Sequence, residues 1–367
     1  MVSYNDATDE VVAKKSDIRD VEMAAYIALS SVKEVTAQDD FSFPDGLANR
    51  VVEATTLGNS RLLAHKRSVC NRTLTPIDEN SIIAYGKYVY AGYNGLTKDF
   101  VIPSRVTNIG VGCFREATVD SITFKGQIYS LNEGLFYHSN AKTITFEKNL
   151  SQPTMVSASI FEGCASLREL TLPPNLQKIG ERMFYNCASL QSIDIPNAAG
   201  EIGEHAFCIC VGLKSFNIAA GVTKVGENAF YNCVTMHTLT IAPLSQMTEI
   251  GNYAFYGCSK LESFTFEGGS SLTTIGQYAF RNCTSLESVS IPSTVTSIGS
   301  NAFNGCTALT EMRIYATTPP TLGATNAIPY QNTDLKIYIP AGTLSAYQAA
   351  TYWKSTSIKN KLIEMEA

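Results

Sequence analysis

Cysteine is the residue type in this chain that could do chemistry of its own, as a metal ligand or as a redox thiol. The chain has ten cysteines in 367 residues. Seven of them lie three residues after a phenylalanine, and 23 or 25 residues apart: Cys164, Cys187, Cys210, Cys233, Cys258, Cys283 and Cys306. Zinc sites use cysteine pairs with about two to four residues between them, which converge on one ion. The observed spacing therefore argues against a metal site.

The cysteines belong to a longer repeat, I-G-x-x-A-F-x-x-C-x-x-L-x-x-h-x-h, in which h is apolar. Its nine copies are 22 to 25 residues apart and begin at Ile109, Leu131, Val156, Ile179, Ile202, Val225, Ile250, Ile275 and Ile298. Counted from this first aliphatic residue, the cysteine stands at position 8, where the first two copies have Ala117 and Ser139. The h-x-h end alternates with a period of two and predicts a short strand. The I-G-x-x-A-F part predicts one helical or 3₁₀ turn.

A single copy cannot bury its own Phe, Leu and strand residues, whereas stacked copies can. We therefore predict an α/β repeat solenoid of the leucine-rich-repeat type, with a parallel sheet along one side, short helical or 3₁₀ turns along the other, and caps at both ends. The predicted domains are an N-terminal helical and β-hairpin region at 1–98, the solenoid at 99–315 and a C-terminal cap at 316–367. Within 1–98 we expect a helix at 20–32, a second one beginning in 44–54 and a hairpin in 81–95.

The repeat resembles the BspA-like leucine-rich repeats of bacterial surface proteins. The motifs that carry the resemblance are IGxxAFxxCxxL and the intervening IPxxVTxIG, which occurs here as IPSTVTSIG at 291–299. The segment IYIPAGTLSAYQAATYWKS at 337–355 also resembles the C-terminal cap of such proteins. Members of this family are described as adhesins and host-interaction factors. The resemblance thus implies a non-enzymatic recognition scaffold, extracellular or on the surface of a bacterial cell.

In a stack, the seven cysteines of position 8 form a column. Their Cα separation of about 4.8 Å would permit a disulfide, but parallel side chains keep the Cβ atoms above the usual ~3.8 Å. We expect a reduced structural ladder of small buried thiols with a weak S–H donor, and occasional adjacent disulfides are the alternative. Cys208, in AFCICVG, is the more exposed candidate thiol, while Cys70 and Cys113 stand alone.

Other chemistry has little support in the sequence. The four histidines share no repeat position, and no nucleophile-elbow, zinc-protease or phosphate-loop motif occurs. We predict no catalytic residue, cofactor or metal. The net charge of −5 argues against a nucleic-acid partner, and no apolar run approaches the roughly 18 residues that span a bilayer. The N-terminus lacks an apolar signal-peptide core, which predicts either no export by the usual route or a leader already removed.

Two surfaces could contact a partner. If strand positions 14 and 16 face the core, positions 13 and 15 face outward as a carpet of small hydroxyls, among them Ser263, Thr265, Ser288 and Ser290. Tyrosines gather on the turn side, namely Tyr185, Tyr231, Tyr253, Tyr256 and Tyr278, and the last three should lie close together. Both sets also have a structural interpretation, because hydroxyls pair across strands and tyrosines cover a core. We expect the ligand to be a protein or a glycan of a host or of a neighbouring cell, and the alternative function is a structural or host-binding virion component of a phage.

Overall fold

The computed structural model describes residues 99–366 apart from 103–107, 110–111, 113, 118, 129–130, 149–155, 243–245 and 265–270, and before residue 99 only the backbone of short strands. Contacts within the chain divide it into two compact units, Met1–Pro173 and Pro174–Ala367. Each unit is described separately below. The domain boundaries predicted at residues 98 and 315 stay predictions.

The first unit contains a parallel sheet whose strands come from successive repeats. Its strands run in the order β10 (Asp99–Ile102), β12 (Ser121–Phe124), β13 (Thr143–Phe146) and β14 (Glu169–Thr171). In β12 and β13, buried Ile and Phe alternate with half-buried Ser and Thr. The period of two that predicts these strands is therefore also the period with which they bury their side chains.

Shorter strands form three further sheets in the first unit. A five-stranded sheet has the order β11 (Asn108–Ile109), β8 (Tyr88–Val89), β7 (Ile82–Tyr85), β6 (Thr73–Asp78) and β3 (Phe41–Ser42). The others are β4 (Val52–Thr55), β5 (Arg61–Ala64) and β9 (Ala91–Gly92), and the pair β1 (Ser3–Asn5) and β2 (Glu10–Val12). Antiparallel pairing of β7 with β8 confirms the predicted hairpin. The helix predicted at 20–32 lies outside the described residues, and the described end of 44–54 is strand β4 instead.

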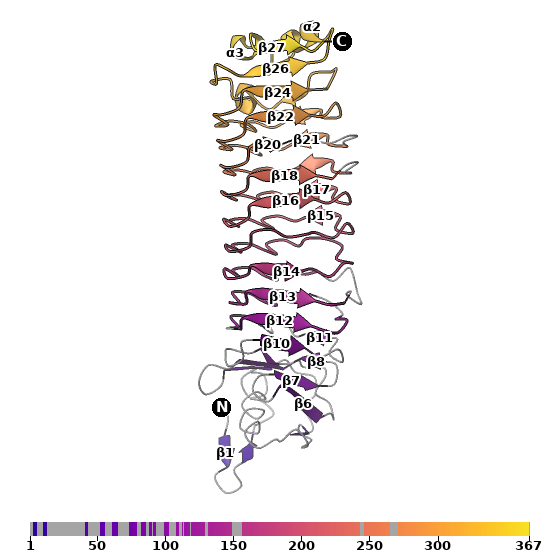
Figure 1. Ribbon diagram of the computed structural model, residues 1–367, viewed down its shortest axis with the longest axis vertical. Helices are drawn as coiled ribbons and strands as arrows, with labels where there is room; N and C mark the ends of the chain where they lie inside the picture. Colours follow the sequence, from indigo (N-terminus) through magenta and orange to yellow (C-terminus); the bar gives the residue numbers. More distant parts are fainter. Residues whose placement is uncertain are drawn as a thin grey trace. The chain divides into compact units, whose positions relative to one another are not determined.

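The second unit carries two parallel sheets (Figure 1). The larger has the order β16 (Ser215–Ile218), β18 (Thr238–Ile241), β20 (Ser263–Phe264), β22 (Ser288–Ile291), β24 (Glu311–Ile314), β26 (Lys336–Ile339) and β27 (Leu362–Glu364). The smaller consists of two-residue strands: β15 (Glu201–Ile202), β17 (Lys224–Val225), β19 (Glu249–Ile250), β21 (Thr274–Ile275), β23 (Ser297–Ile298) and β25 (Thr321–Leu322). Each smaller strand ends on an apolar residue, and in all but β25 this residue opens a copy of the repeat.

The fold is thus a parallel-sheet solenoid of stacked coils with few helices. Among the described residues, helices occur only near the C-terminal end, as η1 (Thr325–Ala327), α2 (Leu344–Ala349) and α3 (Thr356–Lys359). The I-G-x-x-A-F segments form hydrogen-bonded turns, so the predicted helical or 3₁₀ turns are not confirmed. The second sheet was not predicted either, because the first aliphatic residue was assigned to the turn rather than to a strand.

The turns have one backbone geometry in every repeat. The residues at positions 3 and 7 have positive φ, for example His205 at 54° and Asn232 at 56°. Within a copy, amides at positions 4, 6 and 8 bond to the carbonyl three residues earlier, as from Cys210 to Phe207 (3.1 Å). Amides at positions 3, 5 and 7 instead donate to the next copy, as from Phe230 to Ala254 (2.7 Å). The turn side is therefore joined from coil to coil by backbone hydrogen bonds.

The glycine at position 1 is required by the close approach of neighbouring coils. A Cβ atom on Gly276 would lie 2.6 Å from the backbone nitrogen of Asn252 and from the carbonyl carbon of Gly251. These backbone atoms cannot move without shifting the preceding coil. Inside the coils, Phe rings of position 5 stack along the unit, from Phe184 to Phe303, with centroids 4.9 to 5.3 Å apart between neighbours. The glycine of the I-G pair thus allows neighbouring coils to approach closely, and the phenylalanine of the A-F pair fills the core of each coil.

The segment after β25 packs two large aromatic residues beside the last coils. Tyr347 and Trp353 are fully buried, and their rings meet edge to face at 5.1 Å. The Tyr347 hydroxyl donates to the carbonyl of Ala316 and the Trp353 indole donates to the carbonyl of Pro320, both at 2.7 Å. The only Trp of the chain therefore both packs in the core and donates a hydrogen bond to a backbone carbonyl.

Candidate recognition surfaces

The outward face of the larger sheet consists of two rows of side chains in register. One row passes from Ser215 through Thr238, Ser263 and Ser288. The other includes Asn217, Thr240 and Ser290, whereas Thr265 lies outside the described residues. The residues between them, such as Phe216 and Val289, are buried. Over these strands the outward face consists of small polar side chains and has no aromatic one, as the sequence predicts.

The chemistry of both rows changes at β24 and β26. The first row continues with Glu311 and Lys336, and the second with Arg313 and Tyr338, which pairs with Ile363 of β27. Arg313 donates from Nε to Glu311 Oε1 at 2.6 Å, and its guanidinium lies 4.9 Å from the centre of the Tyr338 ring. This hydrogen bond and the Glu311 charge raise the pKa of Arg313. Charged and aromatic groups thus collect at one end of an otherwise plain face.

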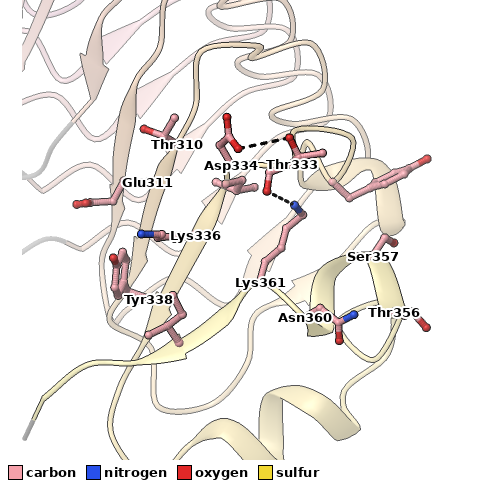
Figure 2. Close-up of a pocket in the computed structure, with 13 residues that line it drawn as sticks. Thr310, Glu311, Thr333, Asp334, Lys336, Tyr338, Thr356, Ser357, Asn360 and Lys361 are labelled. Atoms are coloured by element: carbon pink, nitrogen blue, oxygen red, sulfur yellow. Dashed lines mark hydrogen bonds between the residues drawn. The ribbon is translucent and has the colours of Figure 1, made fainter.

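A broad hollow of about 1160 Å³ lies beside these residues. Figure 2 shows Glu311, Lys336 and Tyr338 on one side and Thr356, Ser357 and Asn360 on the other. The second group belongs to α3 and the residue after it, which continues into β27. The segment after the repeats therefore builds one wall of the hollow, and the sheet builds the other.

Lys361 holds the upper rim of this hollow in place. Its ammonium donates to the carbonyls of Asn332 (2.5 Å) and Thr333 (3.5 Å), as Figure 2 shows for Thr333. The Asp334 amide donates to Oδ1 of Asn332 at 3.2 Å. The loop before β26 is thus tied to the end of the chain, and the Asp334 carboxylate is left exposed at the edge of the hollow.

The tyrosines form a second surface on the turn side. The Tyr253 and Tyr278 rings stack at 4.7 Å, Tyr231 and Tyr256 stack at 4.9 Å, and Tyr253 joins the two pairs by a tilted contact with Tyr256 at 5.8 Å. The Arg281 guanidinium lies 5.3 Å from the centre of the Tyr278 ring. All four rings are half-buried. The cluster predicted for Tyr253, Tyr256 and Tyr278 is therefore present, and Tyr231 extends it.

Tyr185 lies apart from this cluster, because Cys208 replaces tyrosine at position 6 of the intervening repeat. Its ring is covered by the Arg182 guanidinium at 4.1 Å. A shallow hollow of about 370 Å³ lies here between Tyr185 and Tyr231. Cys208 is 4% exposed, so it is only slightly more accessible than the fully buried cysteines of position 8. Burial raises the pKa of its thiol to about 11, although Arg182 opposes the shift.

The cysteines of position 8 lie inside their coils, Cys164 in the first unit and the other six in the second. All seven are free and fully buried. Six thiols donate to the carbonyl of the position-5 residue in the preceding copy, as from Cys258 to Phe230 (3.2 Å) and from Cys306 to Phe280 (3.1 Å): Cys164, Cys210, Cys233, Cys258, Cys283 and Cys306. Burial raises the pKa of Cys164, Cys210 and Cys258 to about 12. Thiols of this kind remain protonated at neutral pH and are poor nucleophiles.

Sequence reasoning missed the hollow of Figure 2 because its two walls come from separate segments. The available signal was the pair of charged residues Glu311 and Arg313 in the outward positions 13 and 15, where no earlier repeat has more than one charged residue. Among the described residues, no three His, Cys, Asp or Glu side chains lie together as metal ligands. In the same part of the chain, no helix has both the length and the apolar character needed to cross a membrane.

Comparison with family models gives one match. A model described as the BspA type leucine-rich repeat region matches residues 83–211, 151–261 and 224–359, which together cover most of the chain. The match reports six copies of the repeat. None of the curated proteins compared with the chain matches it.

Several solved structures are similar at low identity. A leucine-rich cell surface protein from Faecalibacterium prausnitzii is 19% identical, with 81% of this chain and 97% of that one covered and a TM-score of 0.35. A leucine-rich repeat protein from Bacteroides ovatus is also 19% identical, with 85% and 100% covered and a TM-score of 0.35. The pneumococcal vaccine antigen PcpA is 16% identical, with 87% and 100% covered and a TM-score of 0.40. At these values the likenesses carry no argument about function.

Proposed function

Because the chain belongs to the BspA-type leucine-rich repeat family, we propose that it is a non-enzymatic recognition scaffold of the adhesin type, which binds a protein partner through its tyrosine cluster. The family fold is in general a scaffold without catalysis. A stack of coils presents side chains from neighbouring repeats at fixed spacing, so several weak contacts can act together on one partner.

The observation that carries the proposal is the group of half-buried rings formed by Tyr231, Tyr253, Tyr256 and Tyr278 with Arg281. Tyrosine and arginine are the residue types that dominate binding energy at protein interfaces, together with Trp. Stacked rings lose little conformational freedom on binding, because neighbouring rings already hold one another. The carpet of Ser and Thr on the strand side lacks such anchors, so we assign the protein contact to the turn side.

The test is a binding screen of the protein against extracellular-matrix and bacterial surface proteins, followed by the triple variant Tyr253→Asn, Tyr256→Asn and Tyr278→Asn. Asn already occupies the same repeat positions at Asn228, Asn301 and Asn304, and Asn tolerates the positive φ of Tyr253 and Tyr278. We expect at least about 30-fold weaker binding by surface plasmon resonance, since one interface hot spot contributes about 2 kcal/mol or more.

The matched control is the triple variant Ser263→Ala, Ser288→Ala and Ser290→Ala on the strand side, which should bind the same partner as tightly as the unaltered protein. The melting temperatures of both variants establish that the solenoid is intact. Unchanged binding by the folded tyrosine variant, or loss of binding by the serine variant alone, would refute the assignment to the turn side.

The proposal places the protein outside the cell or on a bacterial surface, as the family resemblance implies. Protease treatment of intact cells checks this part independently of any ligand. We expect the protein to be cleaved while a cytoplasmic marker stays intact, and protection equal to that of the marker would contradict a surface location.

A further inference from the structure

We infer that the hollow beside β24, β26 and α3 is a binding site for a neutral saccharide. The inference is independent of the proposed protein contact, because the tyrosine cluster lies on the turn side and the hollow lies on the strand side. It rests on the polar composition of the two walls, on their equal numbers of carboxylates and ammonium groups and on an apolar strip in the lining.

The walls offer hydrogen-bonding groups of every kind that a sugar hydroxyl can use. A hydroxyl both donates and accepts, so a site for several hydroxyls needs acceptors and donors on facing sides. The exposed Asp334 carboxylate supplies an acceptor, the Lys336 ammonium supplies donors, and the Asn360 amide supplies both. Lys336 forms no ion pair with any described residue, and the Asn360 amide forms no side-chain hydrogen bond with one. Both groups are therefore available to a ligand.

Equal numbers of carboxylates and ammonium groups line the hollow, and the Arg313 guanidinium beside it is paired with Glu311. Glu311 and Asp334 contribute two carboxylates, and Lys336 and Lys361 contribute two ammonium groups. Glu311 is engaged by Arg313 and Lys361 by backbone carbonyls. A phosphate or sulfate ligand would call for an excess of positive charge, and a hydrophobic peptide would call for a mainly apolar pocket. A neutral polyhydroxyl compound suits this lining better than either.

Ile363 and the part of the Tyr338 ring that the Arg313 guanidinium does not cover provide the apolar strip. The two residues are paired on neighbouring strands, and Ile363 is 38% exposed, which is unusual for an aliphatic side chain of a sheet. The C–H face of a pyranose ring is apolar and packs on such surfaces, while its hydroxyls point to the polar rim. At about 1160 Å³ the hollow has room for more than one sugar ring.

The experiment uses saturation-transfer NMR on the full chain with neutral oligosaccharides built from glucose, mannose, galactose and N-acetylhexosamine, followed by calorimetric titration of the one that responds. We expect saturable binding to at least one of them. Asn360→Ala and Asp334→Ala should each weaken it about tenfold, because each removes a hydrogen bond to the ligand, in the second case one made by a charged group. Both residues are exposed, so both variants should keep the melting temperature of the unaltered protein.

The control is Thr240→Ala on the same sheet face, away from the hollow, which should leave the affinity unchanged. The tyrosine triple variant should also keep saccharide binding, so that failure of one proposal is distinguished from failure of the other. The inference is overturned if no neutral oligosaccharide binds, if binding is indifferent to Asn360 and Asp334, or if only sulfated and sialylated sugars or peptides bind.

Discussion

At the residue scale, positive φ at positions 3 and 7 is the most demanding feature of the repeat. Glycine, Asn and Asp adopt this conformation most easily, and a β-branched residue there is an outlier. Ile209 has a φ of 60° at position 7. Elsewhere in this column Asn232 precedes Gly257, and Asn282 precedes Gly305. A Cβ atom on Gly257 would overlap Oδ1 of Asn232, so an Asn in one copy favours a Gly in the next.

We predict that Ile209→Gly stabilises the protein. The change relieves the strained φ and creates, after Asn186, the same Asn-then-Gly order. The relieved strain is worth about 1 to 2 kcal/mol, and loss of the half-buried Ile side chain together with the freedom of glycine in the unfolded chain offsets part of it. We expect a net gain of less than about 1 kcal/mol in the free energy of unfolding, measured by urea denaturation. The reverse change, Gly257→Ile, should lose more than this, because it adds both the strain and the overlap. A destabilised Ile209→Gly variant would contradict this account of the column.

The buried thiols predict a loss of stability at alkaline pH. An unfolded cysteine loses its proton near pH 9, whereas the pKa of Cys258 is raised to about 12 in the fold. Between these values the unfolded state binds fewer protons, so stability present below pH 9 is lost as pH rises toward 12. We expect Cys258→Ser to reduce this slope by up to about 1.4 kcal/mol per pH unit, because serine does not titrate in this range.

The measurement is the free energy of unfolding from pH 8 to 11 for both proteins. Serine is the matched replacement because Ser139 fills the same repeat position, is fully buried, and donates to the carbonyl of Ala117 at 3.3 Å. An identical slope for variant and unaltered protein would show that Cys258 titrates alike in both states.

At the scale of elements, α2 and α3 are short and depend on the aromatic pair between them. Neither helix is capped by the side chain of its own N-cap residue, although the Leu344 amide of α2 donates to Glu364 Oε1 at 2.9 Å. Helices of four to six residues are not stable alone. Tyr347 lies in α2, and Trp353 follows it in the connection to α3. Packing of these rings, rather than helix propensity, therefore holds the segment and the α3 wall of the hollow.

We predict that Trp353→Ala costs about 3 to 5 kcal/mol, because it leaves a large cavity and removes the donor to the Pro320 carbonyl. The effect should appear as a lower melting temperature and as protease cleavage within 340–366. Tyr315→Ala, which changes a 44% exposed ring, is the control and should stay within about 0.5 kcal/mol. Equal losses for the two variants would contradict the role of burial.

At the scale of the whole molecule, the strands of four residues could be predicted from the sequence, because their alternation is visible. The two-residue strands could not. Strands such as Ser288–Ile291 show a period of two, and the buried cysteines and outward hydroxyls follow from it. A strand of two residues, such as Ser297–Ile298, shows no period. The positive φ of positions 3 and 7 could not be predicted from residue type, because residues as different as Arg182, His205 and Tyr278 adopt it. The hollow was missed because no repeat contains the α3 wall.

The peptide groups on the turn side of residues 174–367 also have a net dipole along the stack of coils. The amides of positions 3, 5 and 7 donate to the next copy along the chain, as from Arg182 to Glu204 and from Asn282 to Asn304, whereas the glycine amide of position 1 donates to the preceding copy, as from Gly226 to Ile202. Aligned peptide dipoles of about 3.5 D add up, as they do in an α-helix. The C-terminal end of this column presents N–H groups, and the carbonyl of Ala327 accepts the one from Phe303 at 3.1 Å. A chain that stopped before η1 would leave these N–H groups, the positive end of the summed dipole, open to anions. The segment from η1 onward therefore also neutralises part of this positive end.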